Sequence, residues 1–325
     1  CGSGMKTVAL ASQAVRLGDA NVVVAGGMEN MSQGPYVLSK ARFGYRLGHS
    51  EILDSVVSDG LWCQLADCHM GMTAENVASR WEISRGAMDD FSYKSHMKAT
   101  KAWESGTFAE EIVPVHIPQR RGDPKVIDRD EHFRPDASTE QLGRLNPVFK
   151  REDGTVTAGN SSPLTDGASA VILMNEHKMH AEGIEPLGYV RSWAWAALDP
   201  YGQLLQGPAY AVPLALDRAG LEMKNIGLIE MHEAFAAQVL SNLQALASKQ
   251  FAEQELGRST AVGHPDPDLI NVMGGSLSIG HPFGATGGRL TITLLNEMAR
   301  RDVEFGLVTA CAAGGMGFAM VLERR

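Results

Sequence analysis

Apolar residues near the start of the chain follow first a helical and then a strand periodicity. They recur at helical spacing over residues 5–15, and residues 21–25 form a short apolar run typical of a buried strand. The glycine-rich segment 26–32 predicts a break in regular structure. Cys1 is therefore expected at or just before a helix N-terminus, where the helix dipole stabilises a thiolate.

The middle of the chain has a different character. Residues 32–165 are rich in Pro, Gly and charged side chains, and they show helical patterns only at 73–81 and 87–104. We expect this segment to form a lobe of its own, which ends in the small-residue loop 154–162. An apolar strand is expected at 168–174.

Strands and helices alternate over the rest of the chain, which predicts an α/β layer architecture. The expected strands are 189–197, 227–231, 305–310 and 317–322. The expected helices are 209–219, 234–248 and 284–300.

Composition and charge narrow the function classes. The 325 residues are 44% apolar and 21% charged, the balance of a folded chain of two units or one large one. The net charge of -9 argues against a nucleic-acid binder, and no apolar run reaches the length of about 18–20 residues that a membrane span needs. Four scattered cysteines argue against a disulfide framework, so we expect a reducing compartment and a cytoplasmic location.

Three segments carry side chains suited to catalysis. Cys1 opens the chain, His281 lies in the glycine-rich segment 280–287, and Cys311 is expected between the last two strands. A thiol and a histidine are the minimal set for nucleophilic catalysis, because imidazole can take the thiol proton. Each also has a structural interpretation: an inert terminal thiol, a turn histidine and a small core residue. On their own these residues support only the hypothesis of a Cys/His acyl-transfer enzyme.

Several longer motifs resemble those of the thiolase family, the acyl-CoA C-acetyltransferases, over essentially the whole chain. The motifs lie at 1–4 with 26–32, 69–71 with 73–76, 154–162, 232–237 and 271–275, and around His281 and Cys311. The resemblance implies an α/β fold of two similar mixed-sheet halves with an inserted loop lobe. It also implies a dimer or tetramer of such units.

The resemblance divides the chain into three parts. Residues 1–31 and 166–181 would be the remainder of the N-terminal half, 32–165 the lobe that binds coenzyme A, and 182–325 the C-terminal half. The remainder is too short for an α/β half of about 100 residues. We therefore expect the first part of that half to be missing from this chain. A second polypeptide would supply it and cover an otherwise unpaired sheet edge; a truncated chain is the alternative.

The resemblance also assigns roles. Cys1 would be the acylated nucleophile, His281 its activator and Cys311 the group that exchanges the α-carbon proton. His232 stands where many biosynthetic thiolases have Asn, and it would help form an oxyanion site through water. Acyl-CoA and coenzyme A would be substrates, with no metal or redox cofactor. The residues expected to contact coenzyme A are His69, Met70, Ser162, Ala234 and Phe235.

The motifs leave the preferred acyl chain length open. The segment 232–235 is similar to degradative and trifunctional-enzyme thiolases, whereas 69–71 is similar to short-chain biosynthetic ones. After Cys311 the resembled motif often has a glycine where this chain has Ala313, and the backbone N–H at that position would face the second oxyanion. We expect this donor to be retained if φ at Ala313 is negative. The alternatives are a thiolase-fold condensing enzyme of specialised metabolism and a non-catalytic acyl-CoA carrier.

Overall fold

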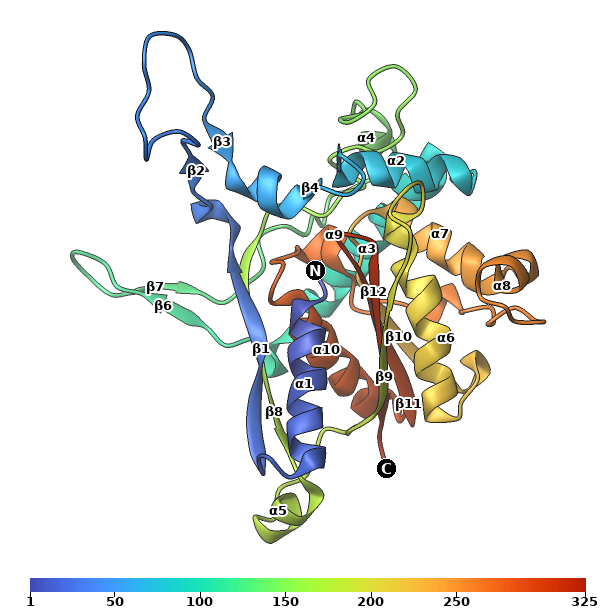
Figure 1. Ribbon diagram of the computed structural model, residues 1–325. Helices are drawn as coiled ribbons and strands as arrows, with labels where there is room; N and C mark the ends of the chain where they lie inside the picture. Colours follow the sequence, from blue (N-terminus) through green and yellow to red (C-terminus); the bar gives the residue numbers. More distant parts are fainter.

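The computed structural model describes residues 1–325, and two helices lie side by side at its centre, between two sheets (Figure 1). These helices are α1 (Ser3–Leu17) and α10 (Thr286–Arg301). Their apolar residues form one core cluster with the sheets, which includes Met5, Leu290 and Val308. The helical spacing of residues 5–15 and 284–300 thus reflects burial on more than one side.

The C-terminal half is built on a four-stranded mixed sheet. The strand order is β10-β11-β12-β9, with β10 and β11 parallel and the other pairs antiparallel. Helix α10 packs on one face, and helices α6 (Gly207–Ala219) and α7 (Ala236–Ala247) pack on the other. The strands are β9 (Tyr189–Ala197), β10 (Leu228–Met231), β11 (Phe305–Ala312) and β12 (Met316–Glu323).

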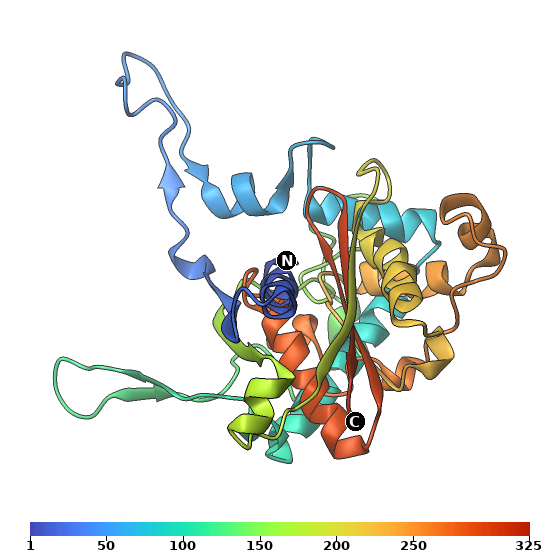
Figure 2. The same ribbon diagram turned by 60° about the horizontal axis from the view of Figure 1, so that its bottom comes forward.

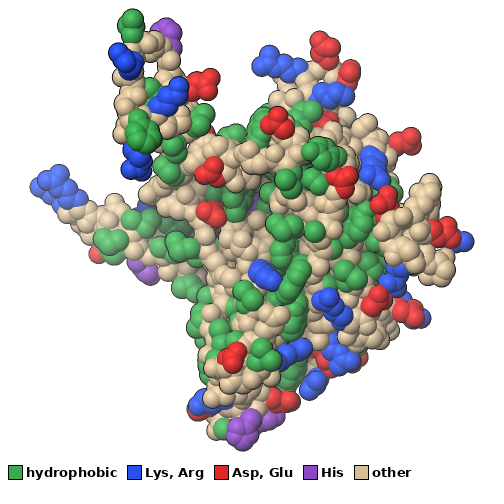
Figure 3. Space-filling model, in the orientation of Figure 1, with side chains coloured by type: hydrophobic (Ala, Val, Ile, Leu, Met, Phe, Trp, Pro, Cys, Tyr) green, Lys and Arg blue, Asp and Glu red, His purple; other side chains and the backbone are tan.

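The other sheet contains only two strands. β1 (Val22–Asn30) pairs antiparallel with β8 (Asp166–Met174), and α1 and α10 cover its inner face. The order α1, β1, β8 repeats the order α10, β11, β12, which confirms two similar halves. The outer face is uncovered: the exposed fractions of Val24, Met28 and Ile172 are 69%, 72% and 65%. Figure 3 shows hydrophobic side chains along this side of the molecule.

Two expectations about local structure are wrong. Residues 26–32 do not interrupt regular structure as predicted, because β1 continues to Asn30. A Cβ on Gly27 would overlap the carbonyl oxygen of Gly284, so this glycine permits close backbone approach and is not a turn residue. Cys311 does not lie between strands either, because β11 extends to Ala312.

The segment between β1 and β8 forms the lobe, from which two arms project (Figure 2). The hairpin β6–β7 forms one arm, and the stretch that carries β2 and β3 forms the other. The lobe helices are α2 (Met70–Arg80), α3 (Arg85–Glu104) and α4 (Thr139–Gly143). The lobe strands are β2 (Tyr36–Val37), β3 (Leu53–Asp54), β4 (Trp62–Cys63), β5 (Cys68–His69), β6 (Val115–Ile117) and β7 (Lys125–Ile127).

Four short helices were not predicted from the sequence, because none is long enough to establish a helical period. They are α4 in the lobe, α5 (Glu176–Ala181), α8 (Lys249–Glu255) and α9 (Ser276–Ile279). None of the helices combines the length and the apolar character that a bilayer crossing requires.

Candidate active site

The N-terminal ends of α1 and α10 meet, and this contact brings Cys1 to His281. Small residues make the approach possible: a Cβ on Gly4 would lie 2.7 Å from the backbone nitrogen of Gly288. A Cβ on Gly287 would overlap the backbone of Met5. Residues that are 280 positions apart in the sequence therefore become neighbours at two helix starts.

Cys1 and His281 form a thiol–imidazole pair. The Cys1 Sγ lies 3.1 Å from Nε2 of His281, and Nδ1 of that ring lies 2.7 Å from Oγ1 of Thr286. The Thr286 hydroxyl donates its only proton to the carbonyl oxygen of Pro282 at 3.1 Å, so it accepts from Nδ1–H. Nε2 is then free to accept the thiol proton. Burial lowers the pKa of His281 well below its usual 6.5, which keeps the ring neutral at physiological pH and leaves the lone pair of Nε2 unprotonated.

His232 lies against His281, with ring centroids 3.9 Å apart. It follows β10 directly, and its Nδ1 lies 2.8 Å from Oγ of Ser276 at the start of α9. Its side chain is 0% exposed, and its Nε2 has no partner within the protein. Burial lowers the pKa of His232 well below 6.5, so a neutral ring presents an unused nitrogen near the Cys1–His281 pair.

Cys311 supplies a second thiol to the same region. It lies near the end of β11 and is 1% exposed. Burial raises the pKa of its thiol to about 12, which keeps Cys311 protonated at neutral pH. Ala313 does not have a positive φ, which is the condition for keeping its backbone N–H as an oxyanion donor. The turn to β12 is made instead by Gly314 and Gly315, with φ of 84° and 75°.

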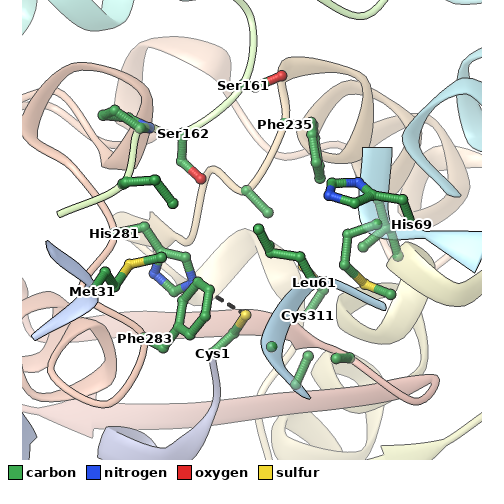
Figure 4. A pocket seen from close by; sticks show the side chains of 18 of the residues that line it. Cys1, Met31, Leu61, His69, Ser161, Ser162, Phe235, His281, Phe283 and Cys311 are labelled. Atoms are coloured by element: carbon green, nitrogen blue, oxygen red, sulfur yellow. Dashed lines mark hydrogen bonds between the residues drawn. The ribbon is translucent and has the colours of Figure 1, made fainter. Parts of the chain in front are cut away.

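Cys1 and Cys311 both line an apolar cavity of about 130 Å³ (Figure 4). All predicted site residues except His232 line this cavity, and His232 contacts it through the ring of His281. Figure 4 shows Cys1, His281 and Phe283 on one side, with His69 and Phe235 on the other. The predicted lining residues are Cys1, His69, Met70, Ser162, Ala234, Phe235, His281 and Cys311.

Aromatic stacking builds the wall opposite Cys1. The ring of His69 stacks on Phe149 at 4.8 Å, and Phe149 meets Phe235 edge-on at 6.5 Å. Nδ1 of His69 also accepts the backbone N–H of Gly71 at 3.0 Å, which caps helix α2. One residue thus ends β5, begins α2 and faces the cavity.

The loop 154–162 closes the cavity from the lobe side. The buried carboxylate of Glu75 accepts the backbone N–H groups of Thr155 and Val156, each at 2.9 Å. At the other end of the loop, Ser162 N donates to Ala234 O at 3.0 Å. The lobe and the C-terminal half are therefore joined at the cavity.

Three positioning residues were not singled out from the sequence: Glu233, Ser276 and Thr286. The buried carboxylate of Glu233 accepts from Asn271 Nδ2 at 2.6 Å and from the backbone N–H of Leu277 at 3.1 Å. It thereby fixes the segment that carries Ser276, the partner of His232. The available signal was their position: Glu233 follows His232 directly, Ser276 follows the motif at 271–275, and Thr286 lies five residues after His281.

Comparison with known proteins decides the family. The model of the thiolase N-terminal domain matches residues 1–177, and that of the thiolase C-terminal domain matches 184–324. The chain belongs to the thiolase family. Among its relatives, it is 46% identical over 324 residues to an acetyl-CoA acetyltransferase of Pseudomonas aeruginosa, covering 100% of this chain and 78% of the relative.

The relatives of this thiolase include both acetyl-CoA acetyltransferases and 3-ketoacyl-CoA thiolases. It is 42% identical to a 3-ketoacyl-CoA thiolase of Shewanella woodyi, over 99% of this chain and 77% of the relative. Among solved structures, the acetyl-CoA acetyltransferase of Syntrophomonas wolfei matches with a TM-score of 0.91 at 37% identity, over 100% of this chain and 78% of that one. Human mitochondrial 3-ketoacyl-CoA thiolase matches with a TM-score of 0.90 at 36% identity, over 100% and 77%.

Proposed function

We propose that this thiolase moves an acyl group between coenzyme A and an acyl-CoA carbon through an acyl-Cys1 intermediate. The reaction is thiolysis of a 3-ketoacyl-CoA or its reverse, the Claisen condensation of two acyl-CoAs. The observation that carries the proposal is the contact of 3.1 Å between Cys1 Sγ and the neutral Nε2 of His281. A thiol beside a base, in an apolar cavity, is the arrangement that nucleophilic catalysis needs.

The steps of thiolysis follow from the protonation states. His281 takes the proton of Cys1, and the thiolate attacks the 3-keto carbon. The C–C bond then breaks, and its electron pair goes to the α-carbon. The buried Cys311 is protonated, so it can donate its proton to that carbanion. The protonated fragment leaves as a shorter acyl-CoA. Coenzyme A then gives its thiol proton to the Cys311 thiolate and attacks the acyl-Cys1 thioester. The Cys1 thiolate leaves and takes its proton back from His281, and the new acyl-CoA is released. Condensation runs the same steps in reverse.

His232 is proposed to stabilise the oxyanion of this reaction. Its Nε2 has no protein partner, and the Ser276 hydroxyl can donate to Nδ1, which leaves a hydrogen on Nε2. A donor that is buried and fixed in advance is worth most where charge develops in the transition state.

Substitutions at His232 test this role. We expect His232→Asn to retain measurable activity, because the amide can donate to the same position. We expect His232→Ala to lose about 2.7–4 kcal/mol of transition-state stabilisation, a fall of about 10²–10³ in kcat. Steady-state rates of variants with parental circular dichroism provide the measurement. Equal rates for His232→Ala and the parent would remove His232 from the mechanism.

The cavity wall is proposed to hold the pantetheine arm of coenzyme A. His69, Met70, Ser162, Ala234 and Phe235 all line this mostly apolar space, which favours a thin, weakly polar chain. Coenzyme A acts here as a substrate. Each step above uses only side chains of this protein and needs no redox cofactor.

Additional thiolase sequence is proposed to cover the outer face of β1 and β8. The support is the exposed apolar stripe of Val24, Met28 and Ile172, because folded proteins seldom leave a sheet face of this kind open. The second polypeptide expected from the sequence would fill this position. The division into 1–31 with 166–181, 32–165 and 182–325, the dimer or tetramer and the cytoplasmic location remain predictions.

Turnover with defined acyl-CoAs tests the proposed function. We expect coenzyme A-dependent cleavage of acetoacetyl-CoA or a longer 3-ketoacyl-CoA, with the parallel double-reciprocal plots of a ping-pong mechanism. The ratio of the two rates gives the chain-length preference. Release of a product other than acyl-CoA would favour the condensing enzyme of specialised metabolism. Binding of acyl-CoA without any acylation of Cys1 would favour the carrier and contradict the proposal.

A further inference from the structure

Three side chains at the cavity form a cluster whose chemistry is not limited to acyl transfer. Cys1 Sγ and one ring nitrogen each of His232 and His281 lie within 4.8 Å of one another. A thiolate and two imidazoles are a ligand set typical of Zn²⁺. We propose that this cluster binds Zn²⁺, or a similar thiophilic divalent cation, and that the bound ion reversibly blocks the nucleophile.

The two histidines are oriented as metal ligands commonly are. In each ring Nδ1 is engaged by a hydroxyl, 2.7 Å away in Thr286 for His281 and 2.8 Å away in Ser276 for His232. Metal-binding histidines usually donate their second ring N–H to such a fixed partner, which sets the tautomer and the ring orientation. The Ser276 hydroxyl can accept as well as donate, so His232 can present a bare Nε2 to a cation.

The free Nε2 of His232 is an independent indication of a ligand. This nitrogen is fully buried and has no hydrogen-bond partner in the protein. Leaving a buried polar group unpaired is unfavourable, and a coordinated cation would give this nitrogen a partner.

The distances require only local adjustment. With Zn–S near 2.3 Å and Zn–N near 2.0–2.1 Å, tetrahedral ligand atoms lie about 3.3–3.6 Å apart. The Cys1–His281 pair is at 3.1 Å and must open slightly, while the widest pair, at no more than 4.8 Å, must close by up to about 1.2–1.5 Å. The Cys1 thiol releases its proton to solvent on binding, and a Zn–S bond forms. The fourth position would face the cavity, open to water.

Cobalt provides a probe that does not depend on turnover. The full chain, freed of metal by a chelator and kept reduced with a phosphine, is titrated with Co²⁺ and followed by near-ultraviolet absorption. We expect a thiolate-to-cobalt charge-transfer band that Zn²⁺ abolishes. Cys1→Ser should lose the band, and His232→Asn should bind Co²⁺ at least tenfold more weakly. The matched control Cys68→Ser, which removes a thiol outside the cluster, should keep the band unchanged.

Several results would overturn the metal site. They are the absence of a band in the parent, a band that survives Cys1→Ser, and equal Co²⁺ affinity in His232→Asn and the parent. The proposed inhibition by the metal rests on the proposed function. Zn²⁺ should stop turnover until a chelator is added, and prior acylation of Cys1 should protect the enzyme from Zn²⁺. A protein that shows the Cys1-dependent band but no thiolase activity would contradict the proposed function alone.

Discussion

Cys1→Ala is expected to abolish acyl-enzyme formation, whereas Cys311→Ala should still become acylated but fail to complete turnover. The expected difference follows from the two environments. Cys1 Sγ has a neutral imidazole at 3.1 Å that can take its proton, while burial raises the pKa of Cys311 to about 12 and keeps it a proton donor. Only Cys1 is therefore equipped to become the nucleophile.

A single-turnover experiment with radiolabelled acetyl-CoA measures this division. Protein is mixed with the label, denatured by acid within one turnover, and counted after the free label is removed. Cys63→Ala removes a buried thiol that does not line the cavity, and it serves as the control for general effects of losing a cysteine. A folded Cys311→Ala variant that takes up no label would show that the two roles are assigned wrongly.

His281→Ala is expected to lower kcat/KM by about 10²–10⁴, the usual contribution of a positioned general base. Burial holds the pKa of His281 well below 6.5, so in the parent the ring stays neutral as the pH falls through 6.5. Its basic form is lost only at still lower pH. The acylation rate of the parent should therefore show no decline centred at 6.5. A decline centred there would contradict the assignment of a buried, neutral base.

Thr286 tests how the base is oriented. Thr286→Val keeps the shape of the side chain but removes the hydroxyl that accepts Nδ1–H of His281. We expect kcat to fall while KM changes little, because the loss is in the ring tautomer and not in substrate binding. Thr286→Ser keeps the hydroxyl and should restore most of the rate. An equal loss in the serine variant would mean that Thr286 acts only through packing.

Elements with a strong local period could be predicted from the sequence. The strand predicted at 189–197 coincides with β9, where small and aromatic residues alternate, and the apolar runs of the C-terminal half coincide with buried strands. Gly27 suggested a break in regular structure, because glycine interrupts many strands, yet here it allows the backbone of Gly284 to approach β1. That approach depends on residues far apart in the sequence, which no local pattern reports.

Some residues of the candidate site could also be predicted from the sequence, and others could not. Cys1 and His281 stood out as residue types, and the family motifs paired them, but only the contact between the ends of α1 and α10 explains their proximity. Ser276 and Thr286 carry no periodic signal, since each acts through one hydroxyl on one imidazole nitrogen. The partnerless Nε2 of His232 is a property of the packed interior, and the sequence has no counterpart to it.

The location of the acyl group tests the central claim most directly. The protein is mixed with acetyl-CoA, quenched in acid, digested and analysed by tandem mass spectrometry for an acetyl thioester. The account predicts the acetyl group on Cys1, lost again when coenzyme A is added before the quench. An acetyl group on Cys311 or another side chain, or protein that turns over acyl-CoA without acetylation at Cys1, would contradict it.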